Sequence, residues 1–229
     1  MTAWACGQWV WAVVGQAGPA QDAAAGRWIL SLLAVVVLPA LLAVMTAFAR
    51  VVIILYFVRA GLGSQVLPPN FVVVGLALVL TWYVMGPTVA DLGAQVASPL
   101  WDQKITAAEA ASRTQEKLRG FMAAHVGAQD FEILARARAV KEQPARAPFE
   151  VLTAAYALSE LRVAFLAGLL IYLPFLVVDV LVYVVVGALG PATFSPQVFA
   201  LPAKVLFFVM ADGWRLLFDA IVRGYLGGG

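Results

Sequence analysis

Three ionisable side chains in the last third of the sequence, Asp179, Lys204 and Asp212, have the chemistry to carry protons or bind ions. Each interrupts a stretch of apolar residues, where an unpaired charge is costly, so such groups are candidates for a proton relay or a transporter ion site. The alternative, which we favour, is a set of salt bridges that hold an assembly together. The two interpretations define two classes of protein: a proton-coupled small-solute transporter, or a structural subunit of a membrane complex. The transporter class also predicts paired repeats, and the sequence shows none.

Four further charges lie in or beside apolar stretches. Glu160 and Arg162 are two positions apart, about 200° around a helix, so they cannot pair with each other. We favour contacts with other helices or subunits for both; the alternative is that both are solvated at a helix end. Arg50 and Arg59 are nine positions apart, about 13 Å along a helix and on nearly opposite faces. Arg50 is expected to form an ion pair across helices, and Arg59, close to Gly61, to be an interfacial, snorkelling arginine.

The other chemically versatile residues do not form a recognisable site. His125 is the only histidine and Cys6 the only cysteine, so neither a disulfide within the chain nor a metal site with several such ligands is expected. The motifs of serine hydrolases, zinc proteases, P-loop NTPases and dinucleotide-binding proteins are missing. An intramembrane enzyme would also need a nucleophile matched with a base. The sequence therefore predicts no catalytic residue, no cofactor and no metal.

The composition is that of a membrane protein. The 229 residues are 63% hydrophobic with a mean hydropathy of +0.90. Only 12% are charged, against about 25% in soluble domains. The net charge of +2 is small and no block of like charges forms a basic arm, so nucleic-acid binding is not expected.

The positions of the charges divide the chain. Of the 28 charged residues, 16 lie between Asp91 and Glu150, which marks one soluble segment. Two uncharged runs precede it, Trp28–Ala49 with 22 residues and Phe71–Ala90 with 20. Each is close to the length that crosses a bilayer as a helix. The connection Gly61–Asn70 contains two glycines and two prolines, so the two runs are expected to form a helical hairpin.

The apolar part after the soluble segment has a different pattern. Val163–Val178 is only 16 residues long and contains Pro174. The final block is interrupted by four charges: Lys204, Asp212, Arg215 and Asp219. Such a helix is expected to be packed among protein neighbours that satisfy these groups. Within it, Gly213 permits a close backbone approach and Trp214 is expected at an interface.

Two helices are expected in the soluble segment. Thr106 and Glu109 have the spacing of a capping box, so the first helix begins there. Gly127 is expected to end it, and a shorter helix should run from about residue 129 to 140. The apolar face of the first helix has members at i, i+3, i+4 and i+7, namely Leu118, Phe121, Met122 and His125.

These patterns give a four-part organisation and an all-α fold class. Residues 1–26 are an N-terminal extension or a degenerate signal, because no Lys or Arg precedes Arg27. Residues 27–90 form a first apolar helical hairpin, 91–150 the soluble helical segment, and 151–229 a second apolar helical hairpin.

The sequence also resembles the FliP/SctR family, the core export-gate membrane subunits of type III secretion systems. Two blocks carry the resemblance in the second half, AAYALSELRVAF (154–165) and LPAKVLFFVMADGW (201–214). The loop stretches DQKITAAEA and LRGFM favour the flagellar branch over the injectisome. The matching residues of the first half are Met45, Thr46, Phe48, Arg50, Arg59, Gly63, Gln65, Pro68, Pro69, Asn70, Gly75, Leu76, Ala77, Leu80, Thr81, Met85 and Pro87.

The resemblance implies a structural, non-enzymatic subunit that assembles into a homo-oligomeric ring, a pentamer, and lines a conduit for unfolded export substrates. Implied partners are gate subunits of the FliQ/SctS, FliR/SctT and FlhB/SctU types. The implied location is the bacterial inner membrane, multi-pass, within a flagellar basal body or injectisome base, with the segment 91–150 in the periplasm. The residues expected to make assembly contacts are Arg50, Glu160, Arg162, Asp179, Lys204, Asp212 and Trp214.

One loop departs from the family pattern. Many members carry consecutive methionines there, which form a flexible gasket that narrows the export pore. This sequence has Pro191, Ala192 and Thr193 instead. The pore is then expected to be closed by the neighbouring Leu189 and Phe194, or by partner subunits.

Overall fold

The computed structural model describes residues 39–63, 68–188 and 195–226, together with Trp28, Leu32 and residues 35–37. The chain divides into two compact units, Met1–Leu42 and Ala43–Gly229. Every regular element in the described part of the second unit is a helix, so the all-α prediction is confirmed.

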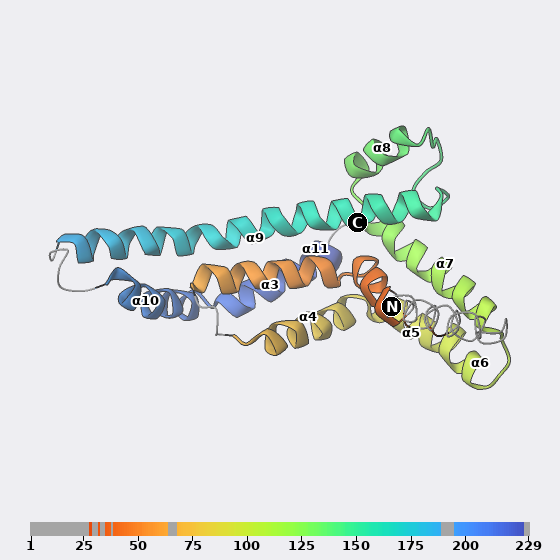
Figure 1. Ribbon diagram of the computed structural model, residues 1–229, viewed down its shortest axis with the longest axis horizontal. Coiled ribbons are helices and arrows are strands. Elements are labelled where there is room, and N and C mark those ends of the chain that lie inside the picture. Colours follow the sequence, from red (N-terminus) through yellow and green to blue (C-terminus); the bar gives the residue numbers. More distant parts are fainter. Residues whose placement is uncertain are drawn as a thin grey trace, which may run out of the picture. The chain divides into compact units, whose positions relative to one another are not determined.

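The helices of the second unit follow one another as labelled in Figure 1. In chain order they are α3 (Phe48–Leu62), α4 (Asn70–Val84), α5 (Gly86–Leu92), a π-helix η1 (Gly93–Ala97), α6 (Ser98–Trp101), α7 (Ala107–His125), α8 (Ala128–Ala137), α9 (Phe149–Ala188), α10 (Pro196–Met210) and α11 (Gly213–Leu226).

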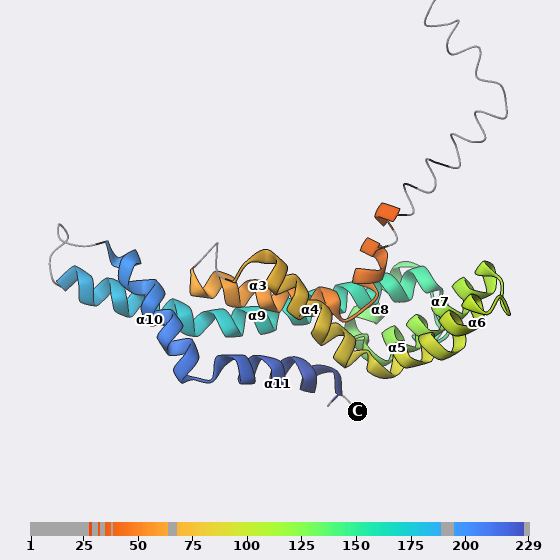
Figure 2. The same cartoon turned by 90° about the horizontal axis from the view of Figure 1, so that it is seen from below.

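Helix α9 is the axis of this unit. Its 40 residues correspond to roughly 60 Å of helix, which continues unbroken past Pro174. Helix α3 lies beside it in the same direction, as Figures 1 and 2 both show. Among the described residues α9 alone is long and apolar enough to cross a membrane, and up to three spans result if each bent pair of helices is counted as one.

Neither uncharged run of the first half is one unbroken helix, although each has the length of a spanning helix. The first run is interrupted at residues 45–47, where the Thr46 hydroxyl donates to the Ala43 carbonyl oxygen and accepts from the Phe48 N–H. These bonds offer the backbone an alternative to the helix. The second run bends by 78° at Met85, just before Gly86 and Pro87, and a proline inside a helix removes one hydrogen bond and clashes with the preceding turn.

Helices α3 and α4 form a hairpin, although α3 lies almost wholly after the first uncharged run. Helices α3 and α4 contact each other, and α3 ends at Gly63, whose φ of 73° is left-handed. Glycine adopts this conformation without the Cβ clash that other residues meet, and its N–H donates to the Ala60 carbonyl oxygen.

In the soluble segment the capping-box prediction is confirmed, and the predicted end of the second helix is wrong. Thr106 accepts from the Glu109 N–H and the Glu109 side chain accepts from the Thr106 N–H, so α7 begins where expected. Helix α8 ends at Ala137, three residues earlier than expected. The reason is a Schellman turn in which Ala139 has a φ of 53° and the Val140 N–H donates to the Ala135 carbonyl oxygen.

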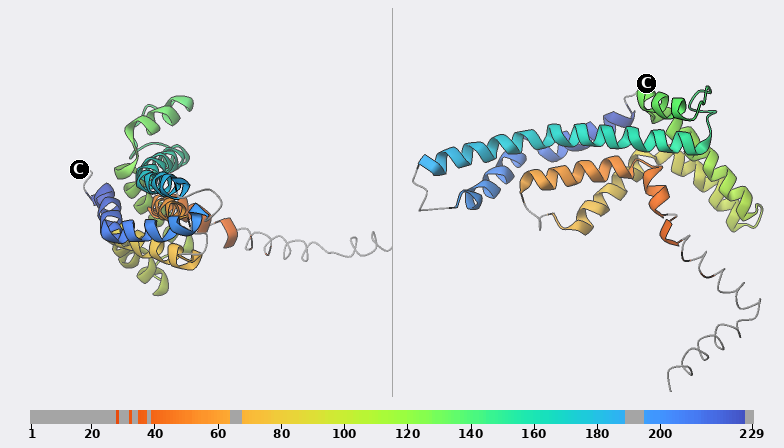
Figure 3. Two further views of the ribbon diagram at one scale, coloured as in Figure 1. Left: turned by 90° about the vertical axis from the view of Figure 1, so that its left-hand side faces the viewer. Right: turned by 45° about the horizontal axis from the view of Figure 1, so that its top comes forward.

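Three apolar clusters hold the helices of the second unit together, and the smallest joins α8 to α9 around Phe131 and Ala155. The first fills the space between α3 and α9 and reaches α4, α10 and α11; its fully buried members include Val51, Ala77 and Ala164. The second lies where α7, α9 and the last turn of α11 meet, around Met122, Leu152 and Tyr156. In Figure 3, α10 and α11 (blue) follow one another beside the pair formed by α3 and α9.

Candidate functional site

Glu160, the most deeply buried charged residue of the described chain, belongs to an ionic centre between three helices. Arg50 in the first turn of α3 and Glu160 of α9 are 6% and 0% exposed. Arg50 Nη2 lies 2.6 Å from Glu160 Oε1. The hydroxyl of Tyr225, from α11, donates to the other carboxylate oxygen of Glu160. Both oxygens of the buried carboxylate therefore accept a hydrogen bond, as a buried charge requires.

Arg50 also fixes the end of α11. Its guanidinium carbon lies 4.0 Å from the centroid of the Tyr225 ring, and its Nη1 donates to the Gly224 carbonyl oxygen at 3.4 Å. A cation over an aromatic face and a bond to a carbonyl at a helix C-terminus are both favourable for the positive charge. We call Arg50, Glu160 and Tyr225 the ionic centre; it joins α3, α9 and α11.

Arg162 has a separate partner on the soluble segment. Its Nε and Nη2 donate to Asp130 Oδ2 at 3.1 and 2.8 Å, and Asp130 is buried. Next to this pair, the Gly127 N–H donates to Ser159 Oγ at 2.9 Å. These bonds fasten α8 to the first half of α9. Glu160 and Arg162 thus contact different elements of the same chain.

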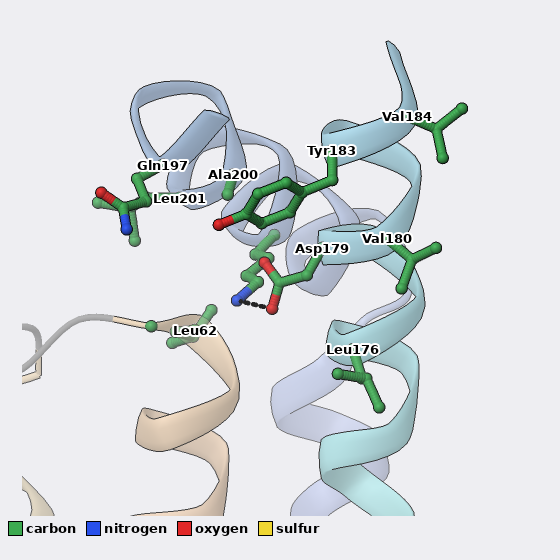
Figure 4. A pocket seen from close by; sticks show the side chains of 11 residues that line it. Leu62, Leu176, Asp179, Val180, Tyr183, Val184, Gln197, Ala200 and Leu201 are labelled. Carbon is green, nitrogen blue, oxygen red and sulfur yellow. Dashed lines mark ion pairs between the residues drawn. The ribbon is translucent and has the colours of Figure 1, made fainter. Parts of the chain in front are cut away.

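Lys204 and Asp179 form a third pair, between α10 and α9. Lys204 Nζ lies 2.7 Å from Asp179 Oδ2, and the lysine is buried while the carboxylate is partly exposed. Figure 4 shows the pair in a cleft of about 560 Å³, with the side chains of Asp179 and Tyr183 pointing from α9 toward α10. The end of α3, at Leu62 and Gly63, forms another wall of this cleft.

Asp212 and Trp214 lie in a different place. Asp212 sits in the turn between α10 and α11 with a φ of 51°, and its carboxylate is 3.8 Å from exposed Arg215. Trp214 packs against Phe208 and Phe218 at ring-centroid distances of 5.2 and 6.1 Å. Asp212 lines a second cleft, of about 1100 Å³, along α4 and α11. Asp179 and Asp212 therefore face different clefts and have different basic partners, so they do not form one acidic site.

Two phenylalanine rings rest on glycines across the seam between α3 and α9. Phe57 of α3 covers Gly168 of α9, and Phe175 of α9 covers Gly61 of α3, so that a Cβ on either glycine would overlap the ring. Glycines inside apolar helices are the sequence signal for such close approaches. Sequence analysis noted Gly61 only as part of a turn and did not notice Gly168.

Other residues of the site also escaped sequence analysis. Tyr225, Tyr156 and Asp130 were not singled out, because none of them belongs to a local charge pattern. Arg59, expected to snorkel, donates to the Asn70 side chain across the hairpin turn. In the described part of the chain, no three His, Cys, Asp or Glu side chains are grouped as metal ligands.

The expected gate loop, with Leu189, Pro191, Ala192, Thr193 and Phe194, lies outside the described residues, as does the N-terminal extension. Their roles stay predictions.

Fold and site together define a helical membrane protein in which one long apolar helix is joined to its neighbours by buried ion pairs. A model of the FliP family matches residues 30–221, so the chain belongs to the FliP family. It is 37% identical over 191 residues to the flagellar biosynthetic protein FliP of Bacillus subtilis, covering 82% of this chain and 86% of the relative. The relative of the same name from Cereibacter sphaeroides is 41% identical over 197 residues, covering 85% of this chain and 65% of the relative. That from Rhizobium meliloti is 35% identical over 213 residues, covering 90% and 87%.

Proposed function

We propose that this protein is a structural subunit of the flagellar type III export gate, which forms a homo-oligomeric ring and lines the conduit for unfolded export substrates across the bacterial inner membrane. The observation that carries the proposal is the family match over residues 30–221, together with relatives named as flagellar biosynthetic proteins. The match includes all three ion pairs described above.

The surface of α9 supports assembly. Large apolar side chains project along its length, among them Leu170 and Val184 at 68% and 66% exposure. In its most apolar stretch of 18 residues only 11% are buried by the chain itself. Exposed apolar patches of this extent are covered in the native state by lipid or by other subunits.

We propose that these other subunits are further copies of the chain, in a pentameric ring, and gate proteins of the FliQ, FliR and FlhB types. The buried ion pairs hold each copy in one conformation before assembly. The energy for export and the choice of substrates then come from other components, because no nucleotide-binding motif is present in the sequence.

Native mass spectrometry of the full chain extracted in mild detergent tests this proposal. The expected result is a ring of identical subunits, formed by the chain alone or on co-expression with its gate partners. A stable monomer under both conditions would contradict the ring. A monomer that moves a small solute across vesicle membranes would favour the transporter alternative.

The side on which the soluble segment lies gives a second test. Ser112 is exposed on α7, so a cysteine placed there in a Cys6→Ser background is expected to react with a membrane-impermeant maleimide in cells whose outer membrane alone is permeabilised. Leu118→Cys is the matched control on the same helix, because Leu118 is 5% exposed and its thiol should react far more slowly. Labelling of Ser112→Cys only after the inner membrane is opened would place the segment in the cytoplasm.

A further inference from the structure

The imidazole of His125 lies between two backbone carbonyl groups. His125 is the last residue of α7 and is partly exposed. Its Nδ1 is 2.8 Å from the carbonyl oxygen of Phe121, and its Nε2 is 3.4 Å from the carbonyl oxygen of Tyr225 in the last turn of α11. A neutral imidazole has one N–H and can donate to only one of these oxygens, whereas an imidazolium donates to both.

Two helix C-termini meet at the His125 ring. The two carbonyl groups belong to the C-terminal turns of α7 and α11, where helix dipoles attract cations. The ring also contacts Phe121 and Tyr225, with centroids 4.4 and 5.4 Å away.

The charged and titratable groups that adjoin Phe121, Tyr225 and Gly127, the neighbours of His125, belong to the ionic centre, to Tyr156 and to the Asp130–Arg162 pair. Arg50 comes from α3, Glu160 and Tyr156 from α9, and Tyr225 from α11. Arg50 and Glu160 carry opposite charges and are paired with each other. The Arg162–Asp130 pair likewise carries no net charge, so the groups in contact with the ring nitrogens are the two carbonyl oxygens.

We propose that His125 is a proton-operated tether that holds the last turn of α11 on α7. When the ring is protonated, both of its N–H groups donate and the two helix ends are joined. When the ring is neutral, the shorter bond to Phe121 is kept and the bond to Tyr225 is lost. Because Tyr225 is also the α11 member of the ionic centre, the proton on His125 controls how firmly α11 is docked there. The tether is complete when the ring is protonated, at low pH, and is released when the ring loses that proton as the pH rises.

Hydrogen–deuterium exchange of the full chain in detergent measures this docking directly. Protection of residues 222–226, corrected for the intrinsic effect of pH on exchange, is compared at about pH 5.5 and about pH 8, either side of the usual histidine range. We expect protection to be about tenfold higher at the lower pH, since a hydrogen bond to a charged group is worth at least that factor. The α9 segment 152–158 serves as the internal control and should keep equal protection at both values.

Two substitutions separate charge from packing. His125→Arg keeps a permanent cation with several donors, so it should give high protection of residues 222–226 at both pH values. His125→Gln has no charge, so it should give low protection at both. Equal protection of these residues in the unmodified protein at both pH values would overturn the proposal, as would pH dependence that survives in His125→Gln.

The single histidine permits one more test. Because His125 is the only histidine in the sequence, ¹⁵N-labelled histidine gives the titration of this ring alone. The midpoint of that titration should coincide with the midpoint of the change in protection at residues 222–226. Distinct midpoints would assign the change to another group and overturn the tether.

Discussion

Replacement of Arg50 by alanine is expected to lower the free energy of unfolding by about 3 to 5 kcal/mol, which is the cost of leaving one partner of a buried ion pair without the other. Glu160 is fully buried, so without the guanidinium its charge is compensated only by the hydroxyl of Tyr225. The measurement is denaturant unfolding of the full chain in detergent. The variant should also fail to assemble into a ring, as measured by native mass spectrometry.

Two comparisons make this result specific. Arg59→Ala, on the same helix, removes a partly exposed arginine whose recorded partner is Asn70, and should cost no more than about 1 kcal/mol. The double variant Arg50→Met, Glu160→Leu removes both charges and should recover most of the loss, since apolar replacement of a buried pair is often nearly neutral. If Arg50→Ala costs no more than Arg59→Ala, the ionic centre does not stabilise the fold.

Glu160→Gln distinguishes a structural carboxylate from a proton carrier. It keeps the shape of the side chain and leaves Arg50 without a counter-charge, so both stability and assembly should fall. A Glu160→Gln protein that assembled normally but abolished export would instead support a proton relay through this residue.

The second large effect is expected at Gly168. A methyl group added there overlaps the ring of Phe57, and overpacking of this kind costs about 1 to 3 kcal/mol. Gly168→Ala should therefore destabilise the chain by that amount in the same unfolding experiment. The displaced ring would also separate α3 from α9.

Gly75→Ala is the matched control for this prediction. Gly75 also lies inside an apolar helix, α4, but a Cβ there would meet nothing within 4 Å. With no clash, the higher helix propensity of alanine should stabilise the chain by up to about 1 kcal/mol. A Gly168→Ala protein as stable as Gly75→Ala would mean that Phe57 moves aside without cost. A double-mutant cycle with Phe57→Leu measures the coupling directly.

Sequence reasoning succeeded where the interaction is local. The capping box of α7 was predictable because Thr106 and Glu109 are three residues apart and their reciprocal bonds depend on the first helical turn alone. Likewise, the positions of Glu160 and Arg162 on opposite sides of a helix follow from their spacing. The spacing does not predict that both residues have partners within the same chain.

The sequence did not reveal contacts between distant segments, nor the places where a single residue interrupts a helix. An ion pair was expected for Arg50, but nothing near Arg50 in the sequence points to Glu160, 110 positions away, or to Tyr225. The two uncharged runs had the length of spanning helices, yet the hydroxyl of Thr46 and the ring of Pro87 interrupt them. By contrast, α9 continues through Pro174, next to Phe175, whose buried ring packs on Gly61 of α3.

The pair of Lys204 and Asp179 also sets how deeply α9 can enter a bilayer. The uncharged stretch Val163–Val178 has 16 residues, or about 24 Å of helix, which is shorter than a hydrocarbon core of about 30 Å. Asp179 alone ends that stretch. When Lys204, 2.7 Å away, neutralises Asp179, the apolar stretch no longer ends at Asp179. It then runs from Val163 to Ala188, 26 residues or about 39 Å. One ion pair thus changes the apolar length of the helix from about 24 Å to about 39 Å, on either side of the thickness of a hydrocarbon core.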